Sequence, residues 1–260
     1  MFPVSDGSVS EATGESVPER GGRRAELVAN LARVRARIAA ACQRAGRDRA
    51  DVTMIAVTKT YPASDVELLA GLGVTDLGEN RDQEAAPKAA RLAEAGVGVR
   101  WHFVGQLQRN KCRSVVGYAD VVHSVDSVRL AGALAAAART RRERPLEVLV
   151  QVSLDGAPDR GGAVAASADA DRGLDPVADA VAATDGTLRL AGLMAVAPLD
   201  WEPDRAFARL AEIAGRLRER HPGARAISAG MSADLDVAIA FGATHVRVGS
   251  ALLGMRSTLR

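Results

Sequence analysis

The chain has 260 residues, of which 47% are hydrophobic and 25% are charged, and these proportions are typical of a soluble globular protein. Its formal net charge of +2 does not indicate a nucleic-acid or membrane partner. The two cysteines, Cys42 and Cys112, lie far apart and in no metal-binding spacing, so we expect a cytoplasmic protein with neither a disulfide framework nor a metal site.

Residues 1–22 are rich in Ser, Gly, Glu and Pro and lack the apolar block of a signal peptide. Because such a segment buries too little apolar surface to become ordered, we predict a disordered tail over 1–22 and a single domain over 23–260. The domain is predicted to begin with a helix, since apolar residues recur at helical spacing at Leu27, Leu31, Val34 and Ile38.

Eight short apolar segments follow, and they are typical of strands that are buried on both faces. They cover 52–60, 74–80, 100–106, 120–126, 146–154, 188–196, 224–230 and 244–250. Ala-, Leu-, Glu- and Arg-rich segments separate nearly all of them and predict helices, for example over 63–72, 81–95, 127–143, 203–221 and 232–241. This alternation indicates an α/β fold, a single TIM-like (β/α)8 barrel with an extra N-terminal helix, with a doubly wound sheet as the structural alternative. Residues 155–173 are predicted to form a long mobile loop or, alternatively, a lid.

One lysine lies at the end of the first predicted strand, in the sequence MIAVTKTYP. The chain has only three lysines, and Lys59 follows an apolar run that should be buried, where an ammonium group is costly. We expect desolvation to favour its neutral amine, which is the nucleophile toward a carbonyl group. The alternative is a structural lysine that pairs with a carboxylate such as Glu79.

Small residues follow the last two predicted strands, in SAGMSADL and VRVGSALLG. The loops at these places in a (β/α)8 barrel commonly bind phosphate, because backbone N–H groups and helix N-termini favour an anion there. A phosphorylated aldehyde would satisfy both ends of such a site, with its phosphate in the loops and its carbonyl group at Lys59. A lysine-dependent aldolase without a cofactor is an alternative that uses the same arrangement.

Five motifs carry a resemblance to a known family. In chain order, over residues 25–256, they are AVTKTYPASDVELLAGLGVTDLGENRDQEAAPK, WHFVGQLQRNK, VVHSVDS, GLMAVAP and SAGMSADLDVAIAFGATHVRVGSALLG. The chain resembles the pyridoxal-phosphate homeostasis proteins, which are themselves similar to the barrel domain of fold-type III enzymes such as alanine racemase. The resemblance implies that the chain binds pyridoxal 5′-phosphate as an internal aldimine on Lys59 and takes part in intracellular homeostasis of this cofactor.

The resemblance also implies a set of cofactor-binding residues. Arg247 would face the pyridine nitrogen and keep it unprotonated, because a guanidinium group offers only donors. Asn80 would lie beside the ring or its 3′-oxygen, and Met194 would either pack near the ring or serve as ordinary core. The full set is Lys59, Asn80, Met194 and Arg247, with Ser228, Gly230, Ser232, Gly249 and Ser250 at the phosphate.

Two histidines, a polar cluster and one difference from the family pattern concern the rest of the barrel mouth. His102 and His123 are expected to be core histidines rather than catalysts, and Lys111 ends a polar cluster that could offer a secondary anion contact. The family often has a lysine in the loop after the fifth strand where this chain has Arg160, and this loop is longer here.

Racemization in the related enzymes needs a second base, a tyrosine from a further domain that we do not detect here. Tyr61 lies two positions from Lys59, on the same side of an extended strand, and is a poor candidate for the opposite face. We therefore expect a monomeric cofactor carrier without catalysis, with cofactor-requiring apo-enzymes as candidate partners. The alternative is a weak amino-acid racemase or another fold-type III enzyme.

Overall fold

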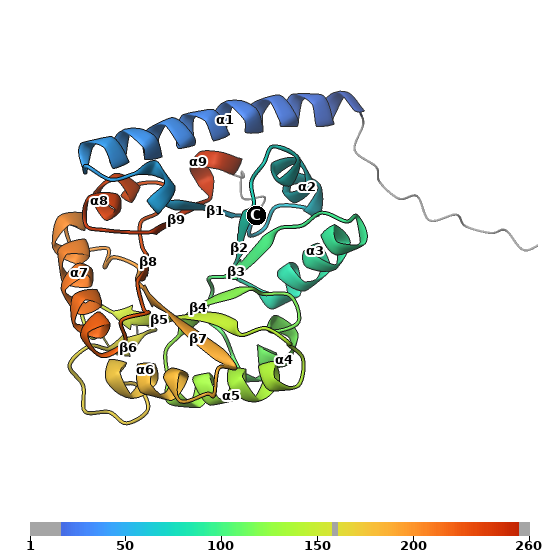
Figure 1. Cartoon of the computed structure of the whole chain (residues 1–260). Helices are drawn as coiled ribbons and strands as arrows, with labels where there is room; N and C mark the ends of the chain where they lie inside the picture. Colours follow the sequence, from blue (N-terminus) through green and yellow to red (C-terminus); the bar gives the residue numbers. More distant parts are fainter. Residues whose placement is uncertain (1–16, 158–160, 255–260) are drawn as a thin grey trace, which may run out of the picture.

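The computed structural model describes residues 17–157 and 161–254, and within them a ring of parallel strands is surrounded by helices (Figure 1). The strands are β1 (Thr53–Val57), β2 (Asp76–Glu79), β3 (Arg100–Phe103), β4 (Val121–Val125), β5 (Leu146–Ser153), β6 (Ala163–Val164), β7 (Leu188–Met194), β8 (Ala226–Ser228) and β9 (His245–Val248). The helices are α1 (Val17–Arg44), α2 (Ala63–Gly71), α3 (Asp82–Glu94), α4 (Cys112–Val115), α5 (Val128–Arg139), α6 (Leu174–Ala182), α7 (Pro203–Arg220), α8 (Leu235–Ala240) and α9 (Ser250–Leu253).

The sheet closes on itself. Its strand order is β4-β3-β2-β1-β9-β8-β7-β5-β6, and an additional pairing joins β4 to β5. The short strand β6 only extends the edge beside β5, so the other strands of the described part form the barrel. The predicted (β/α)8 barrel is confirmed, and the doubly wound sheet is excluded because an open sheet would lack the β4–β5 pairing.

The predicted strands are all present but shorter than expected, and some elements were not predicted. β1 ends at Val57, before Lys59, and β6 is additional, whereas α4, α6 and α9 follow strands as a (β/α)8 barrel requires, although no bounds were predicted for them. The predicted loop over 155–173 contains β6, where the N–H of Val164 donates to the carbonyl oxygen of Arg172 (2.8 Å). Arg160, the residue that departs from the family pattern, lies outside the described residues.

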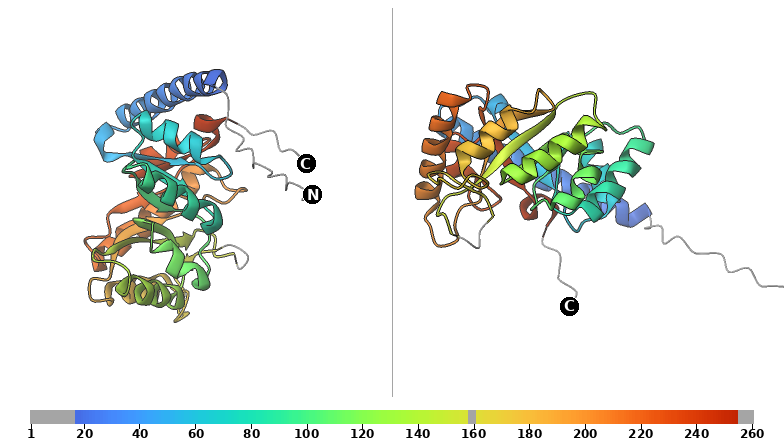
Figure 2. Two further views of the ribbon diagram at one scale, coloured as in Figure 1. Left: turned by 90° about the vertical axis from the view of Figure 1, so that its right-hand side faces the viewer. Right: turned by 90° about the horizontal axis from the view of Figure 1, so that it is seen from below.

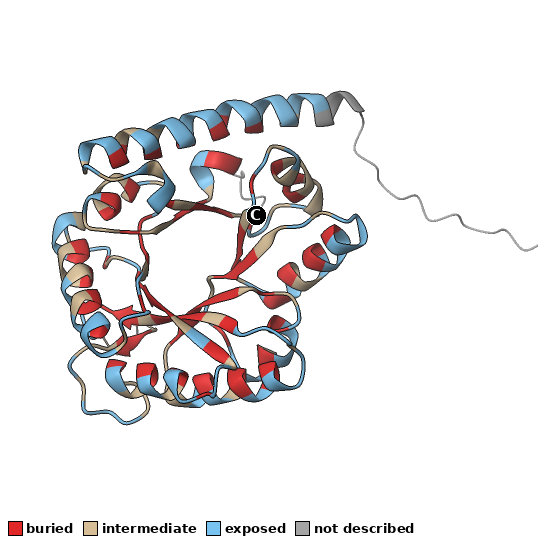
Figure 3. Ribbon diagram, in the orientation of Figure 1, coloured by how far each residue is buried: buried red, intermediate tan, exposed pale blue. Residues whose placement is uncertain are grey.

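Helix α1 lies along the outside of the barrel against α8 and α9 (Figures 1 and 2). Its predicted apolar stripe is buried, with Leu27 and Ile38 at 0% exposure, and Figure 3 shows the buried positions facing the barrel. Burying each such side chain contributes about 1.5–3 kcal/mol. The helix begins at Val17, inside the segment predicted as a tail, of which residues 1–16 lie outside the described ranges.

Among the described helices, none combines the length and the apolar character needed to cross a membrane.

Candidate functional site

The residues predicted to form the site lie along one arc of the barrel rim. They are at or just beyond the carboxyl ends of β2, β1, β9, β8 and β7, which are consecutive neighbours in the ring. In that order the arc carries Asn80, Lys59, then Arg247 with Gly249 and Ser250, then Ser228 with Gly230 and Ser232, and finally Met194. The carboxyl rim is where (β/α)8 barrels hold their ligands, so this arc is the candidate site.

Arg247 is fixed inside the arc and is only 6% exposed. Its Nη1 donates to the carbonyl oxygen (2.9 Å) and to Oγ (2.8 Å) of Ser228, and its Nη2 donates to the carbonyl oxygen of Ala195 (2.9 Å). Desolvation lowers the pKa of Arg247 to about 10, against an opposing effect of Asp234, so the guanidinium stays charged at neutral pH. The structure thus places an immobilised cation where β7, β8 and β9 end.

The turns that follow β8 and β9 approach each other. The N–H of Ala251, next to Ser250, donates to Oγ of Ser232 (3.4 Å) and so joins the two turns. Gly230 has a φ of +85°, and a Cβ there would lie 2.6 Å from Cβ of Ala238, so the first turn requires glycine at this position. Both turns therefore bring hydroxyl groups and backbone N–H groups to one place.

The helix N-termini contribute less to this place than the sequence suggested. Helices α8 and α9 have only six and four residues, so each is shorter than two turns. The N–H of Met231, which precedes α8, already donates to Oδ1 of Asp234 (2.6 Å). Short helices have weak dipoles, so binding of an anion here would depend mainly on the hydroxyl groups and the remaining turn N–H groups.

Lys59 lies in a turn beyond the end of β1 and is exposed, so the expectation of a buried lysine at a strand end is wrong. No hydrogen bond or ion pair joins its ammonium group to any residue in the described ranges. Because the side chain is in water, the expected desolvation of the amine is absent. Its reactivity has to come from exposure and position instead.

The buried lysine is Lys88 of α3, which is 7% exposed. Its Nζ donates to Oε1 of Glu79 (2.6 Å) and to the carbonyl oxygen of Thr58 (2.9 Å), and Oγ1 of Thr58 donates to the same Oε1 (2.7 Å). Burial raises the pKa of Glu79, while hydrogen bonds from Lys88 and Thr58 oppose this shift. Glu79 is therefore engaged by Lys88, and the alternative pairing with Lys59 is not present.

Asn80 and Met194 occupy opposite ends of the arc. Oδ1 of Asn80 is buried and has no hydrogen-bond partner among the described residues, which is unusual for a buried acceptor. Met194 is 2% exposed and packs inside the barrel with Val121, Leu149 and Ala191. Asn80 thus offers an unused polar atom, whereas Met194 has the contacts of an ordinary core residue.

Histidines fill the barrel below this arc. Nδ1 of His102 lies 2.8 Å from Nε2 of His123, and Nε2 of His102 lies 2.9 Å from Oδ1 of Asp76. Burial lowers the pKa of His123, with His102 and His245 adding to the shift, and burial also lowers the pKa of His245 to about 4. His102 and His123 are core residues, as predicted, and His245 completes the group.

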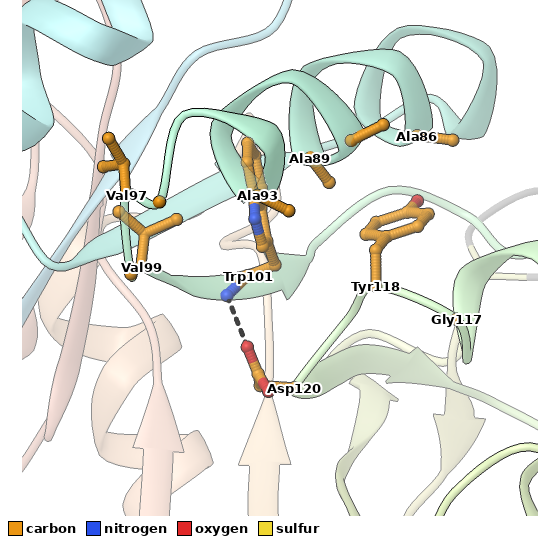
Figure 4. A pocket seen from close by; sticks show the side chains of 12 residues that line it. Ala86, Ala89, Ala93, Val97, Val99, Trp101, Gly117, Tyr118 and Asp120 are labelled. Carbon is orange, nitrogen blue, oxygen red and sulfur yellow. Dashed lines mark hydrogen bonds between the residues drawn. The ribbon is translucent and has the colours of Figure 1, made fainter.

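Two cavities in the described part of the chain are informative, and neither is lined by the turns after β8 and β9. A cavity of about 660 Å³ lies on the outer wall between α3 and the start of β3, lined by Ala89, Trp101 and Tyr118. At its edge the backbone N–H of Trp101 donates to Oδ2 of Asp120 (2.9 Å; Figure 4). None of the predicted site residues lines this cavity. A cavity of about 220 Å³ lies at the rim itself, between the end of β5 and Val196 after β7. We therefore place the site by its chemistry, at the rim.

Sequence reasoning named Glu79 as a candidate partner of Lys59 but missed Lys88, which binds Glu79 instead. The signal was present, because a glutamate inside the apolar segment VTDLGEN needs a cationic or hydrogen-bonding partner when it is buried. Lys88, which follows within the same motif, supplies it. Lys111 lies elsewhere, half-buried, with Nζ 3.8 Å from Oδ2 of Asp82.

Comparisons with known proteins show the family and the fold of the chain. The family model of the alanine racemase N-terminal domain matches residues 29–257. A pyridoxal phosphate homeostasis protein of Mycobacterium leprae is 46% identical over 248 residues, which cover 90% of this chain and 95% of the relative. The structure of PipY from Synechococcus elongatus with PLP bound is 31% identical, with a TM-score of 0.71, and the match covers 88% of this chain and 100% of PipY. Alanine racemase from Corynebacterium glutamicum, at 16% identity and a TM-score of 0.64, shares the fold over 91% of this chain and 62% of its own.

Proposed function

This chain belongs to the alanine racemase N-terminal domain family, among the pyridoxal phosphate homeostasis proteins, and we propose that it binds pyridoxal 5′-phosphate covalently through Lys59. Its role is to hold this cofactor reversibly and so to buffer its intracellular supply. The cofactor supplies an aldehyde that condenses with a primary amine and releases one water molecule. The residues of the arc bind and orient it.

The observation that carries this proposal is the difference between the three lysines of the chain. Lys88 is buried in an ion pair with Glu79, and Lys111 is half-buried beside Asp82. Lys59 alone is both exposed and without an ion-pair partner among the described residues, and it lies on the arc. An amine that attacks an aldehyde must be accessible and must lose its proton to solvent, which favours Lys59.

The rest of the arc fits the other parts of the cofactor. Hydroxyl groups of Ser232 and Ser250 and the N–H groups of the joined turns suit a phosphate group. Arg247 is an immobilised cation with only donors, so a ring nitrogen facing it would stay unprotonated. The unpartnered Oδ1 of Asn80 marks a polar position on the opposite side of Lys59.

We further propose that the chain does not use the cofactor for racemization. The sequence contains two tyrosines as candidates for a second base. The hydroxyl of Tyr61 donates to the carbonyl oxygen of Gly254 (2.6 Å), and the hydroxyl of Tyr118 faces Asp82 at 3.4 Å beside the outer-wall cavity. Neither arrangement supports proton abstraction from an amino acid on the face opposite Lys59.

Chemical trapping tests the proposal. Protein incubated with pyridoxal 5′-phosphate is reduced with borohydride, and peptide mass spectrometry is expected to find the label on Lys59. Lys59→Ala should abolish the label, whereas the matched control Lys111→Ala should keep it. A label on Lys111, or none, would contradict the proposal. Turnover of D- or L-amino acids at ordinary enzymatic rates would contradict the carrier role and favour the racemase alternative.

The proposal also covers the oligomeric state, the cellular location and the partners of the chain. We propose that the chain acts as a monomer in the cytoplasm and delivers the cofactor to apo-enzymes that require it. Exposed large apolar side chains in the described part are few, namely Val28, Val196, Leu199 and Met231, which supports a monomer. Light scattering of the purified chain tests its mass, and transfer to an apo-enzyme tests delivery.

A further inference from the structure

The turn that carries Lys59 is bonded to helix α3 on both sides of the lysine. The carbonyl oxygen of Thr58 accepts a hydrogen bond from Nζ of Lys88 (2.9 Å), and the N–H of Thr60 donates to Oε2 of Glu84 (2.7 Å). Glu84 and Lys88 are four positions apart on α3, so their side chains leave the same face of the helix. Helix α3 therefore holds the backbone of both residues that flank Lys59.

The conformation of Thr60 shows that this turn is constrained. Its φ is +63°, in the left-handed region, where a β-branched residue is strained. Strained residues persist where surrounding contacts determine their conformation, and they concentrate at functional sites. The bond to Glu84 is one such contact, and the next residue, Tyr61, is fixed by the bond of its hydroxyl to Gly254. The strain is thus localised next to Lys59.

Neither Glu84 nor Lys88 is hydrogen-bonded or ion-paired to Lys59 in the described part of the chain. Lys88 is 7% exposed, between Thr58 and Glu79. The second oxygen of Glu84, Oε1, lies 3.7 Å from Nη1 of Arg81, the residue that precedes α3. Any influence of these two residues on Lys59 is therefore transmitted by the backbone of the turn.

We propose that Glu84 and Lys88 are positioning residues for Lys59, which present its amine to an aldehyde bound at the rim. The inference rests on the proposed function, since it assumes that Lys59 is the residue that binds the aldehyde. Without the bond from Glu84, the strained Thr60 relaxes and the amine spends less time in the reactive geometry. Attachment then becomes slower, while the turns after β8 and β9 are unaffected.

The test uses Glu84, because loss of the buried Lys88 endangers the fold itself. Glu84→Ala removes the acceptor for Thr60 N–H, and Glu84→Gln keeps an amide oxygen that can accept it. Glu94→Ala, at the exposed end of the same helix, is the matched control. The full-length apo-protein is mixed with pyridoxal 5′-phosphate, and the label on Lys59 is followed by borohydride quenching and mass spectrometry. We expect attachment to be about tenfold slower in Glu84→Ala and unchanged in Glu84→Gln and Glu94→Ala.

Two further measurements separate positioning from general damage. Pyridoxine 5′-phosphate carries an alcohol in place of the aldehyde, so its affinity reports on the rest of the site, and it should be the same in Glu84→Ala and in the unaltered chain. In the apo-protein, hydrogen exchange of the Thr60 amide should become about tenfold faster in Glu84→Ala.

The outcomes are distinct. Equal attachment rates in Glu84→Ala and the unaltered chain would overturn this inference, and so would an equal loss of affinity for pyridoxine 5′-phosphate. A chain that acquires no label on Lys59 even when unaltered would overturn the proposed function instead.

Discussion

Residues 58–61 (the Lys59 turn) and the group of Arg247, Ser228 and Ala195 (the Arg247 cluster) lie near the ends of neighbouring strands, β1 and β9. They are built in opposite ways. Lys59 has an exposed side chain on a backbone that α3 holds through Thr58 and Thr60. Arg247 has a buried side chain that three hydrogen bonds hold directly. A nucleophilic amine must exchange its proton and approach a carbonyl carbon. Only the backbone of such a residue can therefore be held in place. A cation that faces a ring atom can be fixed completely.

The helices that support the two regions also differ. On the Lys59 side, α3 uses one acidic and one basic residue, Glu84 and Lys88. On the other side, α1 donates to backbone carbonyl groups, from Arg37 to Ser232 and Ala233 and from Asn30 to Leu252 (2.8 Å). The extra N-terminal helix therefore braces the turn after β8 and the helix after β9. Separate substitutions can test each side.

Replacement of the buried lysine is expected to have the largest effect on stability. Lys88→Met leaves the carboxylate of Glu79 buried without its cation, and loss of one partner of such a pair costs about 3–5 kcal/mol. Urea unfolding measures the loss. The exposed lysine is the control, because Lys59→Met should change the free energy of unfolding by less than about 0.5 kcal/mol.

A double variant identifies the cause of this loss. In Glu79→Leu/Lys88→Met no charge is left buried, so this variant should be more stable than Lys88→Met alone. If Lys88→Met unfolds at the same urea concentration as Lys59→Met, the ion pair of Lys88 with Glu79 does not stabilise the folded chain.

Substitution in the Arg247 cluster should lower the free energy of unfolding less than Lys88→Met does, because removal of the cation also removes the cost of burying a charge. Arg247→Leu leaves the carbonyl oxygens of Ser228 and Ala195 without this donor, and we expect a loss of about 2–3 kcal/mol in the free energy of unfolding. Arg44→Leu, at an exposed arginine of α1, is the control and should cost less than about 0.5 kcal/mol. Equal losses in Arg247→Leu and Arg44→Leu would show that the hydrogen bonds of Arg247 do not stabilise the folded chain.

Acidification should weaken the barrel below Arg247. Burial lowers the pKa of His245 from 6.5 to about 4 and lowers that of His123, so the unfolded chain binds more protons between these values. The free energy of unfolding therefore falls as the pH falls from 6.5 toward 4, by at most about 1.4 kcal/mol per pH unit for each histidine. Unfolding in urea between pH 7 and pH 5 measures the slope, and His245→Gln should reduce it. An unchanged slope in His245→Gln would show that folding does not lower the pKa of His245.

The fold and the arc could be predicted because they depend on local patterns. Continuous apolar segments predicted the strands, and the glycines and serines after the last two predicted the turns now seen around Gly230 and Ser250. Each of these signals lies within a few neighbouring residues, and the order of a closed barrel then brings the ends of the chain together.

The environment of Lys59 could not be predicted in the same way. The strand pattern placed it in the core, but β1 ends at Val57, and the next residue, Thr58, bonds to Glu79 and Lys88, which are 21 and 30 positions away. The contact of Arg37 with Ser232 spans 195 positions. Contacts between elements decide which lysine is buried. Such contacts cannot be predicted from the hydrophobic pattern of a single segment.

The smallest expected effect concerns the brace on the Arg247 side. Arg37→Ala removes the donors to Ser232 and Ala233 at a partly exposed position, so the free energy of unfolding should fall by only about 0.5–1.5 kcal/mol. Affinity for pyridoxine 5′-phosphate should nevertheless fall roughly three- to tenfold, because the turn that carries Ser232 loses its support. Arg44→Ala is the matched control, since Arg44 bonds to Asp236 but not to the turn. If Arg37→Ala keeps full affinity for pyridoxine 5′-phosphate while Glu84→Ala loses it, two assignments are contradicted. These are the support of the Ser232 turn by Arg37 and the restriction of Glu84 to the Lys59 turn.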